Sequence, residues 1–284
     1  RERMWYDHNK DNFSELPALK DNTFGSSLFF VPFKGHKIEF NIGSLHEYRY
    51  GGEMTSNPPH LAMQSEERVH DILLGNLDYS HDFNNGLGSL IVYVAGEKTS
   101  RDHYTGIRPE IGTNDDQIHL LNPPYGTTLG TTKQAGVQLN YNFKKLFGPN
   151  LITVGNEYVS DYIFDEISTY NYSLNREVTN LGAFIQSDWS LNERLNLLSG
   201  LRFDNHSLLE SIVIKPRFSL LYKLEERLQF RMSYSTGFRA PQAFDADLHM
   251  SFAGGGVSRV LLDEDLKQED SRSLSTSINY DKAT

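Results

Sequence analysis

Cysteine and long apolar segments are both absent from this chain of 284 residues. Without cysteine, the fold can contain neither a disulfide framework nor a thiolate metal site. No run of about eighteen apolar residues occurs, which excludes a transmembrane helix, and the mean hydropathy is −0.50. Positive charge is also scarce, because the net charge is −10. An acidic chain is unsuited to the phosphate backbone, so we expect no nucleic-acid partner.

The main positive feature is a repeated alternation of apolar and polar residues. Residues 137–144 show it most clearly. The two sets there are Val137, Leu139, Tyr141 and Phe143, and Gln138, Asn140, Asn142 and Lys144. A period of two places such sets on opposite faces of a β-strand.

Similar segments of about ten residues recur along the chain, joined in turn by a short and a long connection. About eleven strands are expected, a length and number suited to crossing a bilayer with tilted strands. Their expected ranges are 24–33, 38–45, 71–81, 87–97, 134–144, 151–161, 180–189, 194–204, 212–222, 228–237 and 272–280. Asn84-Asn85-Gly86 is a strong hairpin signal, because Asn and Gly accept positive φ. The longest expected loops cover residues 48–68, 100–133, 164–177 and 238–268.

Two architectures alternate in this way: a transmembrane β-barrel and a soluble β-sandwich or barrel. The inward-facing set contains several cations, which a packed soluble core would not hold but a wide, wet lumen would. These cations are Arg194, Arg202, Lys215, Arg217 and Arg231. The rotation of short and long connections also favours the membrane barrel. The fold predicted is therefore all-β, a transmembrane antiparallel β-barrel.

Two stretches carry a resemblance to a known family. One is LGAFIQSDW over residues 181–189, followed by LNLLSGLRFD over residues 195–204. The other is YSTGFRAPQAF over residues 234–244, with Asp265-Leu266-Lys267 downstream. They resemble the barrel of TonB-dependent outer-membrane receptors, and Phe238, Arg239, Ala240 and Pro241 are similar to a motif of that family. Residues 47–53 resemble versions from Bacteroidetes-type bacteria.

The resemblance implies a plugged barrel of about 22 strands, of which residues 1–284 would form part of one barrel domain. It implies uptake of a scarce nutrient, such as a ferric siderophore, cobalamin or haem, with energy supplied by TonB through a segment outside this chain. The implied location is the bacterial outer membrane, in contact with lipid. No cofactor is implied, since haem would be cargo. We expect the chain to be an interior piece, unable to transport alone.

Residues 7–15 have the spacing of oxygen ligands in a calcium loop. The candidate ligands are Asp7, Asn9, Asp11, Phe13 through its backbone carbonyl, and Glu15. Ala18 stands where an EF-hand has its bidentate glutamate, so the loop is not an EF-hand. A looser calcium loop and a solvated Asp/Asn turn both remain open.

Candidate ligand-binding residues lie where long loops leave the strands. They are Tyr48, Arg49, Tyr50, His103 and Tyr104, which can stack on or hydrogen-bond a planar or anionic ligand. The alternative is the ordinary aromatic rim of a barrel. His249 lies where haem-binding members of the resembled family place a ligand, or it is a loop histidine with no ligand. Arg239 is expected to brace the loop beneath Pro241.

Enzyme signatures are absent: the sequence has no nucleophile elbow, phosphate loop or HExxH motif. We therefore expect a transport protein and not an enzyme. A passive porin or an adhesive barrel is the alternative function, and a soluble β-rich enzyme a third.

Overall fold

The computed structural model describes residues 1–144, 148–225, 227–241, 250–253, 256–259, 263 and 265–281. Within them, one sheet has twelve strands in the order β1 to β11 and then β14, and a second sheet pairs β12 with β13. The strands are β1 (Glu2–Arg3), β2 (Ala18–Phe30), β3 (His36–Gly52), β4 (Gln64–Phe83), β5 (Gly88–Ile107), β6 (Tyr125–Phe143), β7 (Asn150–Ile167), β8 (Tyr172–Asn192), β9 (Leu195–His206), β10 (Val213–Glu225), β11 (Leu228–Arg239), β12 (Met250–Ala253), β13 (Gly256–Arg259) and β14 (Glu269–Tyr280).

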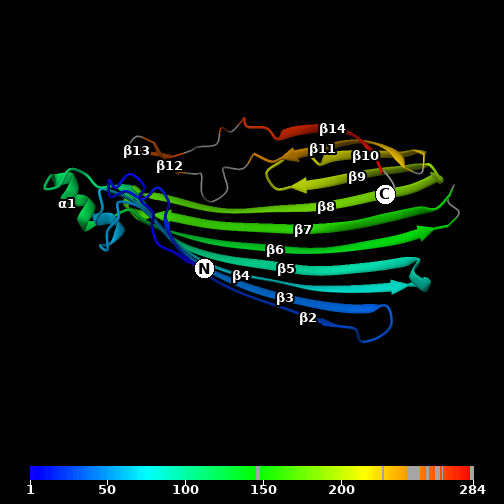
Figure 1. The fold of residues 1–284 in the computed structure, drawn as a ribbon, viewed down its shortest axis with the longest axis horizontal. Helices are drawn as coiled ribbons and strands as arrows, with labels where there is room; N and C mark the ends of the chain where they lie inside the picture. The colour runs from blue at the N-terminus through cyan, green and yellow to red at the C-terminus, as the bar shows by residue number, and fades with distance from the viewer. Residues whose placement is uncertain are drawn as a thin grey trace.

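Neighbours in the large sheet are consecutive antiparallel strands, apart from the step from β11 to β14. Strands β2 to β8 run side by side along the long axis of the molecule (Figure 1). The short connections after β2, β4 and β8, called the tight turns below, gather at one end of the sheet, and helix α1 (Asn114–Leu121) lies at the other. The all-β antiparallel prediction is confirmed, and β2 to β11 with β14 are the eleven strands expected.

Several strands are longer than the sequence pattern predicted. β4 and β5 each have 20 residues and β8 has 21, and twenty residues extend about 66 Å at 3.3 Å each. Much of the loops predicted at residues 48–68, 100–133 and 164–177 is therefore strand. The strand extensions were missed because their residues do not alternate cleanly, although the ladder hydrogen bonds continue.

The prediction of strictly alternating short and long connections is wrong between β7 and β8. Only a 3₁₀ turn, η3 (Ser168–Tyr170), and Asn171 connect these strands at the end opposite the tight turns. Asn171 has φ 48°, a left-handed conformation that Asn accepts. The predicted turn at residues 84–86 is present, with positive φ at all three residues.

The two faces of the sheet differ in character. Directly paired residues point to the same side of a sheet, so one cross-strand row defines each face. On the apolar face, a row from β3 to β8 consists of Phe40, Leu77, Val94, Ala135, Tyr158 and Leu181. On the polar face, the adjacent row consists of Glu39, Asp78, Tyr93, Gly136, Glu157 and Gly182.

Ion pairs and hydrogen bonds connect the charges of the polar face. Glu157 accepts hydrogen bonds from Tyr93 at 2.6 Å and Gln134 at 2.9 Å. Arg202 lies 2.9 Å from Asp204 and 3.4 Å from Glu157. Apolar side chains are instead exposed on the other face, where Leu181 and Val94 are each about half exposed, at 51% and 50%. This distribution suits a wet lumen on one side and lipid on the other.

Helix α1 is the only α-helix in the described residues, with eight residues and Thr113 as its N-cap. Within that part of the chain, no helix has the length and apolar character needed to span a membrane.

Candidate ligand-binding site

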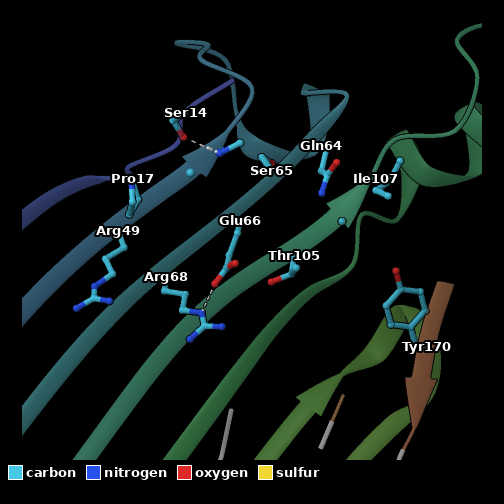
Figure 2. A pocket seen from close by; sticks show the side chains of 13 residues that line it. Ser14, Pro17, Arg49, Gln64, Ser65, Glu66, Arg68, Thr105, Ile107 and Tyr170 are labelled. Carbon is cyan, nitrogen blue, oxygen red and sulfur yellow. Dashed lines mark hydrogen bonds and ion pairs between the residues drawn. The ribbon is translucent and has the colours of Figure 1, made fainter. Parts of the chain in front are cut away.

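A pocket of about 650 Å³ is lined by residues of β3, β4 and β5 (Figure 2). It lies at the end of the sheet where α1 is found (Figure 1). Strands β3, β4 and β5, the segment before β2 and the turn after β7 contribute to it. Its lining residues are Ser14, Pro17, Arg49, Gly51, Gly52, Gln64, Ser65, Glu66, Arg68, Thr105, Gly106, Ile107 and Tyr170.

Glycine at position 52 allows the rim of this pocket to form. Gly52 has φ +106°, and a Cβ atom there would lie 2.4 Å from the Gln64 carbonyl oxygen. Its N–H donates to Ser14 Oγ at 3.0 Å, and its carbonyl accepts from the Ser14 N–H at 2.9 Å. This reciprocal pair fixes the segment before β2 against the end of β3.

Two arginines dominate the charge of the pocket. Arg49 and Arg68 are direct cross-strand partners. Each forms an ion pair on its own strand, Arg49 with Glu47 and Arg68 with Glu66, both at 2.7 Å. Like charges placed opposite each other destabilise a strand pair unless anions lie close by. The guanidinium groups are partly exposed, at 54% and 32% of the side chain, so an anion in the pocket can approach them.

A buried polar cluster lies beside the arginines on the same face. His103 is the cross-strand partner of Arg68, and its Nε2 lies 3.3 Å from Asp165 Oδ1. Asp165 is fully buried and accepts a short hydrogen bond from Thr128. Arg101 donates to Thr128 at 2.9 Å and lies 4.0 Å from Asp165. The cluster joins β5, β6 and β7 and holds the wall of the pocket in place.

The strand register sorts the predicted ligand-binding residues onto two faces. Arg49 and His103 lie on the polar face in one row with Arg68. Tyr50 and Tyr104 lie in the next row, with Glu67 and Tyr125, and therefore point to the opposite side. Tyr48 also belongs to that opposite side, where its hydroxyl donates to Glu67 at 3.1 Å. The structure thus brings Arg49 and His103 together and separates them from the three tyrosines.

The tyrosines help to hold helix α1 against the sheet. Tyr104 is completely buried, and its ring centroid lies 5.1 Å from that of Tyr125. His60 Nδ1 and the Tyr125 hydroxyl are 2.9 Å apart, and His119 on α1 donates from Nε2 to the His60 carbonyl at 3.0 Å. Burial raises the pKa of the Tyr104 phenol and lowers the pKa of His60. Both groups are therefore uncharged near neutral pH.

An ion pair completes the attachment of the helix. Arg108 donates from Nε to Asp116 Oδ1 at 2.6 Å and from Nη1 to the Leu61 carbonyl at 3.2 Å. The hydrogen bond from Arg108, with a second from the Gly112 N–H, lowers the pKa of Asp116.

The predicted calcium loop forms a network of side-chain to backbone hydrogen bonds. Asp7 accepts from the N–H groups of Lys10 at 2.6 Å and Asn12 at 3.0 Å. Asp11 accepts from the Phe13 N–H at 2.9 Å, and Glu15 accepts from the His8 N–H at 2.7 Å. The Asn9 side chain accepts from the Asp11 N–H at 3.1 Å. In the described part of the chain, no three His, Asp or Glu side chains are grouped to hold a metal ion. Calcium binding stays a prediction.

The Phe238 to Pro241 motif lies at the end of β11. The Phe238 ring lies 5.6 Å from Lys215 Nζ and meets the His206 ring edge-on at 6.4 Å. Arg239 is the last residue of β11 and pairs with Glu269 of β14, and Ala240 is buried. His249 lies outside the described residues.

Sequence reasoning missed Arg68, Arg101, Thr128 and Asp165, which come from four different strands. Only the register brings them beside Arg49 and His103. Gly126 was a usable signal, because a glycine inside a strand often marks the close approach of another group. In the structure, a Cβ atom there would lie 2.4 Å from His103 Cε1.

Comparison with protein-family models identifies this architecture. Residues 12–284 match the model described as TonB dependent receptor-like, beta-barrel. The chain belongs to this family. Its members are receptors of the Gram-negative outer membrane and not enzymes, and this barrel segment lies in that membrane. The apolar face therefore contacts lipid and the polar face lines the lumen. Comparison with curated protein sequences gave no match.

Solved structures share the fold at low sequence identity. The siderophore receptor PirA from Pseudomonas aeruginosa superposes with a TM-score of 0.71 at 13% identity, over 94% of this chain and 44% of that one. A mutant of the ferric enterobactin receptor PfeA from the same organism gives 0.72 at 15% identity, over 98% and 43%. The alcaligin receptor FauA from Bordetella pertussis gives 0.63 at 14%, over 94% and 41%. The chain thus spans less than half the length of these receptors.

Proposed function

We propose that the full-length protein takes up a ferric siderophore, or another scarce anionic nutrient, through the outer membrane with energy from TonB. The observation that carries this proposal is the pocket on the polar face, where Arg49 and Arg68 face each other beside His103. Family membership supports a receptor, and the structural neighbours named above are siderophore receptors. Haem and cobalamin are the alternative cargoes.

The pocket is suited to an anion for two reasons. Guanidinium groups offer several donors in a fixed plane and stay charged at every relevant pH. Glu47 and Glu66 balance the formal charge of the two arginines and orient them, with N···O distances of 2.7 Å, so an anion is bound through the directed N–H donors and not through a net positive charge. Charge-assisted hydrogen bonds contribute about 1.5–3 kcal/mol each, so loss of one arginine contact weakens anion binding by about tenfold or more.

Growth of a deletion strain on single iron sources tests the proposal. Complementation with the full-length protein should restore growth on one ferric siderophore. The Arg49→Gln/Arg68→Gln double variant should lose it, because both cations of the pocket are removed. Arg194→Gln/Arg227→Gln is the matched control, since it also removes two cations, from the turns after β8 and β10 at the other end of the sheet.

Two results would contradict the proposal. Equal growth of the double variant and the unsubstituted protein would exclude the arginine pair from cargo binding. Uptake that persists in a strain lacking TonB would favour the passive porin.

A further inference from the structure

The lipid-facing side of the sheet carries two lysines that the transport function does not use. Lys98 on β5 and Lys133 on β6 occupy adjacent strands, where Lys98 pairs with Thr131 and Lys133 pairs with Gly96. This offset makes them diagonal neighbours on one face, within about 7–8 Å at the backbone. Both are exposed, and neither has a hydrogen bond or ion pair to another described residue.

Their depth in the membrane follows from the strand ends. β5 begins at Gly88 and β6 ends at Phe143, both beside tight turns. A tilted strand crosses the hydrocarbon layer in about nine to eleven residues, and the short turns of such barrels face the periplasm. Counting from these turns therefore puts both lysines at the outer edge of the layer. The exposed rings of Tyr158 and Tyr162 on β7 lie at the same level, as expected of an interfacial aromatic belt.

The surface next to Lys98, on the side toward the tight turns, is recessed. Gly75 and Gly96 are direct partners on the apolar face, in one row with Ile42 and Lys133. Leu77 and Val94, the next paired residues toward the tight turns, are exposed and apolar. The two glycines leave a strip without side chains between apolar residues, and this strip can accept an acyl chain. Lys98 and Lys133 lie at the end of the strip farther from the tight turns.

A groove adjoins the recess on its other side. It has a volume of about 480 Å³, and Phe24, Leu73 and Lys98 are among its lining residues. Two acidic groups near the lysines already have partners. Asp71, which also lines this groove, pairs with His46 at 2.7 Å. Glu177 accepts from Ser160, the cross-strand partner of Lys133, at 3.1 Å. Two unpaired cations therefore remain at the edge of the lipid layer.

We propose that Lys98 and Lys133 bind the phosphate of a phosphorylated lipid of the outer leaflet, whose acyl chain lies over Gly75 and Gly96. Charge complementarity identifies the headgroup, because an ammonium pair at the membrane surface attracts anionic lipid. The apolar recess identifies the ligand as a lipid and not a free anion. The site is separate from the pocket on the polar face and does not depend on which cargo is transported.

Native mass spectrometry of the full-length protein in detergent tests the site with three probes: bisphosphorylated lipid A, dephosphorylated lipid A and inorganic phosphate. One equivalent of phosphorylated lipid A should bind. Lys98→Gln/Lys133→Gln should weaken it roughly 30-fold, taking about 1 kcal/mol for each interfacial lysine. Lys34→Gln/Lys144→Gln, which removes the same charge beside the tight turns, should leave binding unchanged.

Gly96→Leu tests the recess without changing charge. An added Cβ atom there would meet only the Thr132 carbonyl oxygen, at 3.6 Å, so the strand can accept the side chain. The leucine should fill the strip and weaken lipid binding. Normal binding by this variant would refute the acyl position. Three results would overturn the phosphate site. Both lysine double variants could weaken lipid binding equally, dephosphorylated lipid A could bind as tightly as the phosphorylated form, or inorganic phosphate could displace the bound lipid.

Discussion

Replacing Asp165 by alanine should destabilise the barrel more than any exposed substitution near it. Asp165 is fully buried, accepts from Thr128 and lies 3.3 Å from His103 and 4.0 Å from Arg101. Arg101 is itself only 6% exposed. Removing one member of a buried ion pair leaves an uncompensated charge, at a cost of about 3–5 kcal/mol.

Two further variants separate charge from hydrogen bonding. Asp165→Asn removes the same charge but keeps an acceptor oxygen for Thr128, so it should lose less stability than Asp165→Ala by the contribution of one hydrogen bond, about 0.5–1.5 kcal/mol. Combining Asp165→Leu with Arg101→Met removes both charges, and this pair should recover much of the stability lost in Asp165→Ala. Asp102→Ala is the control on β5, because Asp102 is exposed and accepts only from Thr127 at 3.1 Å among the hydrogen bonds of the described residues.

Urea unfolding of the full-length protein in lipid vesicles measures these differences in free energy. Asp165→Ala should lower the free energy of unfolding at least three times as much as Asp102→Ala does. A loss below about 1 kcal/mol for Asp165→Ala, the range of a surface pair, would refute a structural role for the buried cluster.

Two other predictions concern the loops. Calcium titration should show saturable binding that Asp7→Ala and Asp11→Ala abolish. If the unsubstituted protein binds no calcium, residues 7–15 form only a hydrogen-bonded turn. Burial of His60 lowers its pKa below 6.5; attachment of α1 is then most stable above pH 6.5 and weakens as the pH falls toward the lowered pKa. The protection factors of the α1 amides, which correct for the intrinsic pH dependence of exchange, should fall as the pH is lowered from 7.5 to 5, and His60→Gln should remove this fall.

The fold could be predicted because the alternation of apolar and polar residues indicates which side chains of a strand face lipid. The row from Phe40 to Leu181 alternates with the row from Glu39 to Gly182 over the same strands, and only a two-sided environment requires this pattern. The pattern fades in the outer parts of β4, β5 and β8. Those parts lie beyond the hydrocarbon layer, where no lipid-facing side imposes alternation, so composition no longer distinguishes strand from loop.

The site was only partly predictable because it depends on register. His103 and Tyr104 are adjacent in sequence and were predicted together, yet one belongs to the row of Arg68 and the other to the row of Tyr125. Residue type alone could not assign them to different faces. A shift of one residue in the pairing would exchange these faces, and the sequence near residues 100–105 contains no apolar alternation that fixes the register.

The same physics explains why this chain has so few buried apolar side chains. Nine hydrophobic residues are buried among the described positions, and several of them, including Tyr50, Tyr104 and Ala240, lie where strands end or loops attach. In a soluble domain, the residues from Phe40 to Leu181 would have to be covered by protein. Here lipid covers them, so the apolar face supplies a membrane contact instead of a core. Internal cohesion must then come from the strand ladders and from polar groups such as Asp165 and Glu157, which is why substitutions on the polar face should be the most damaging.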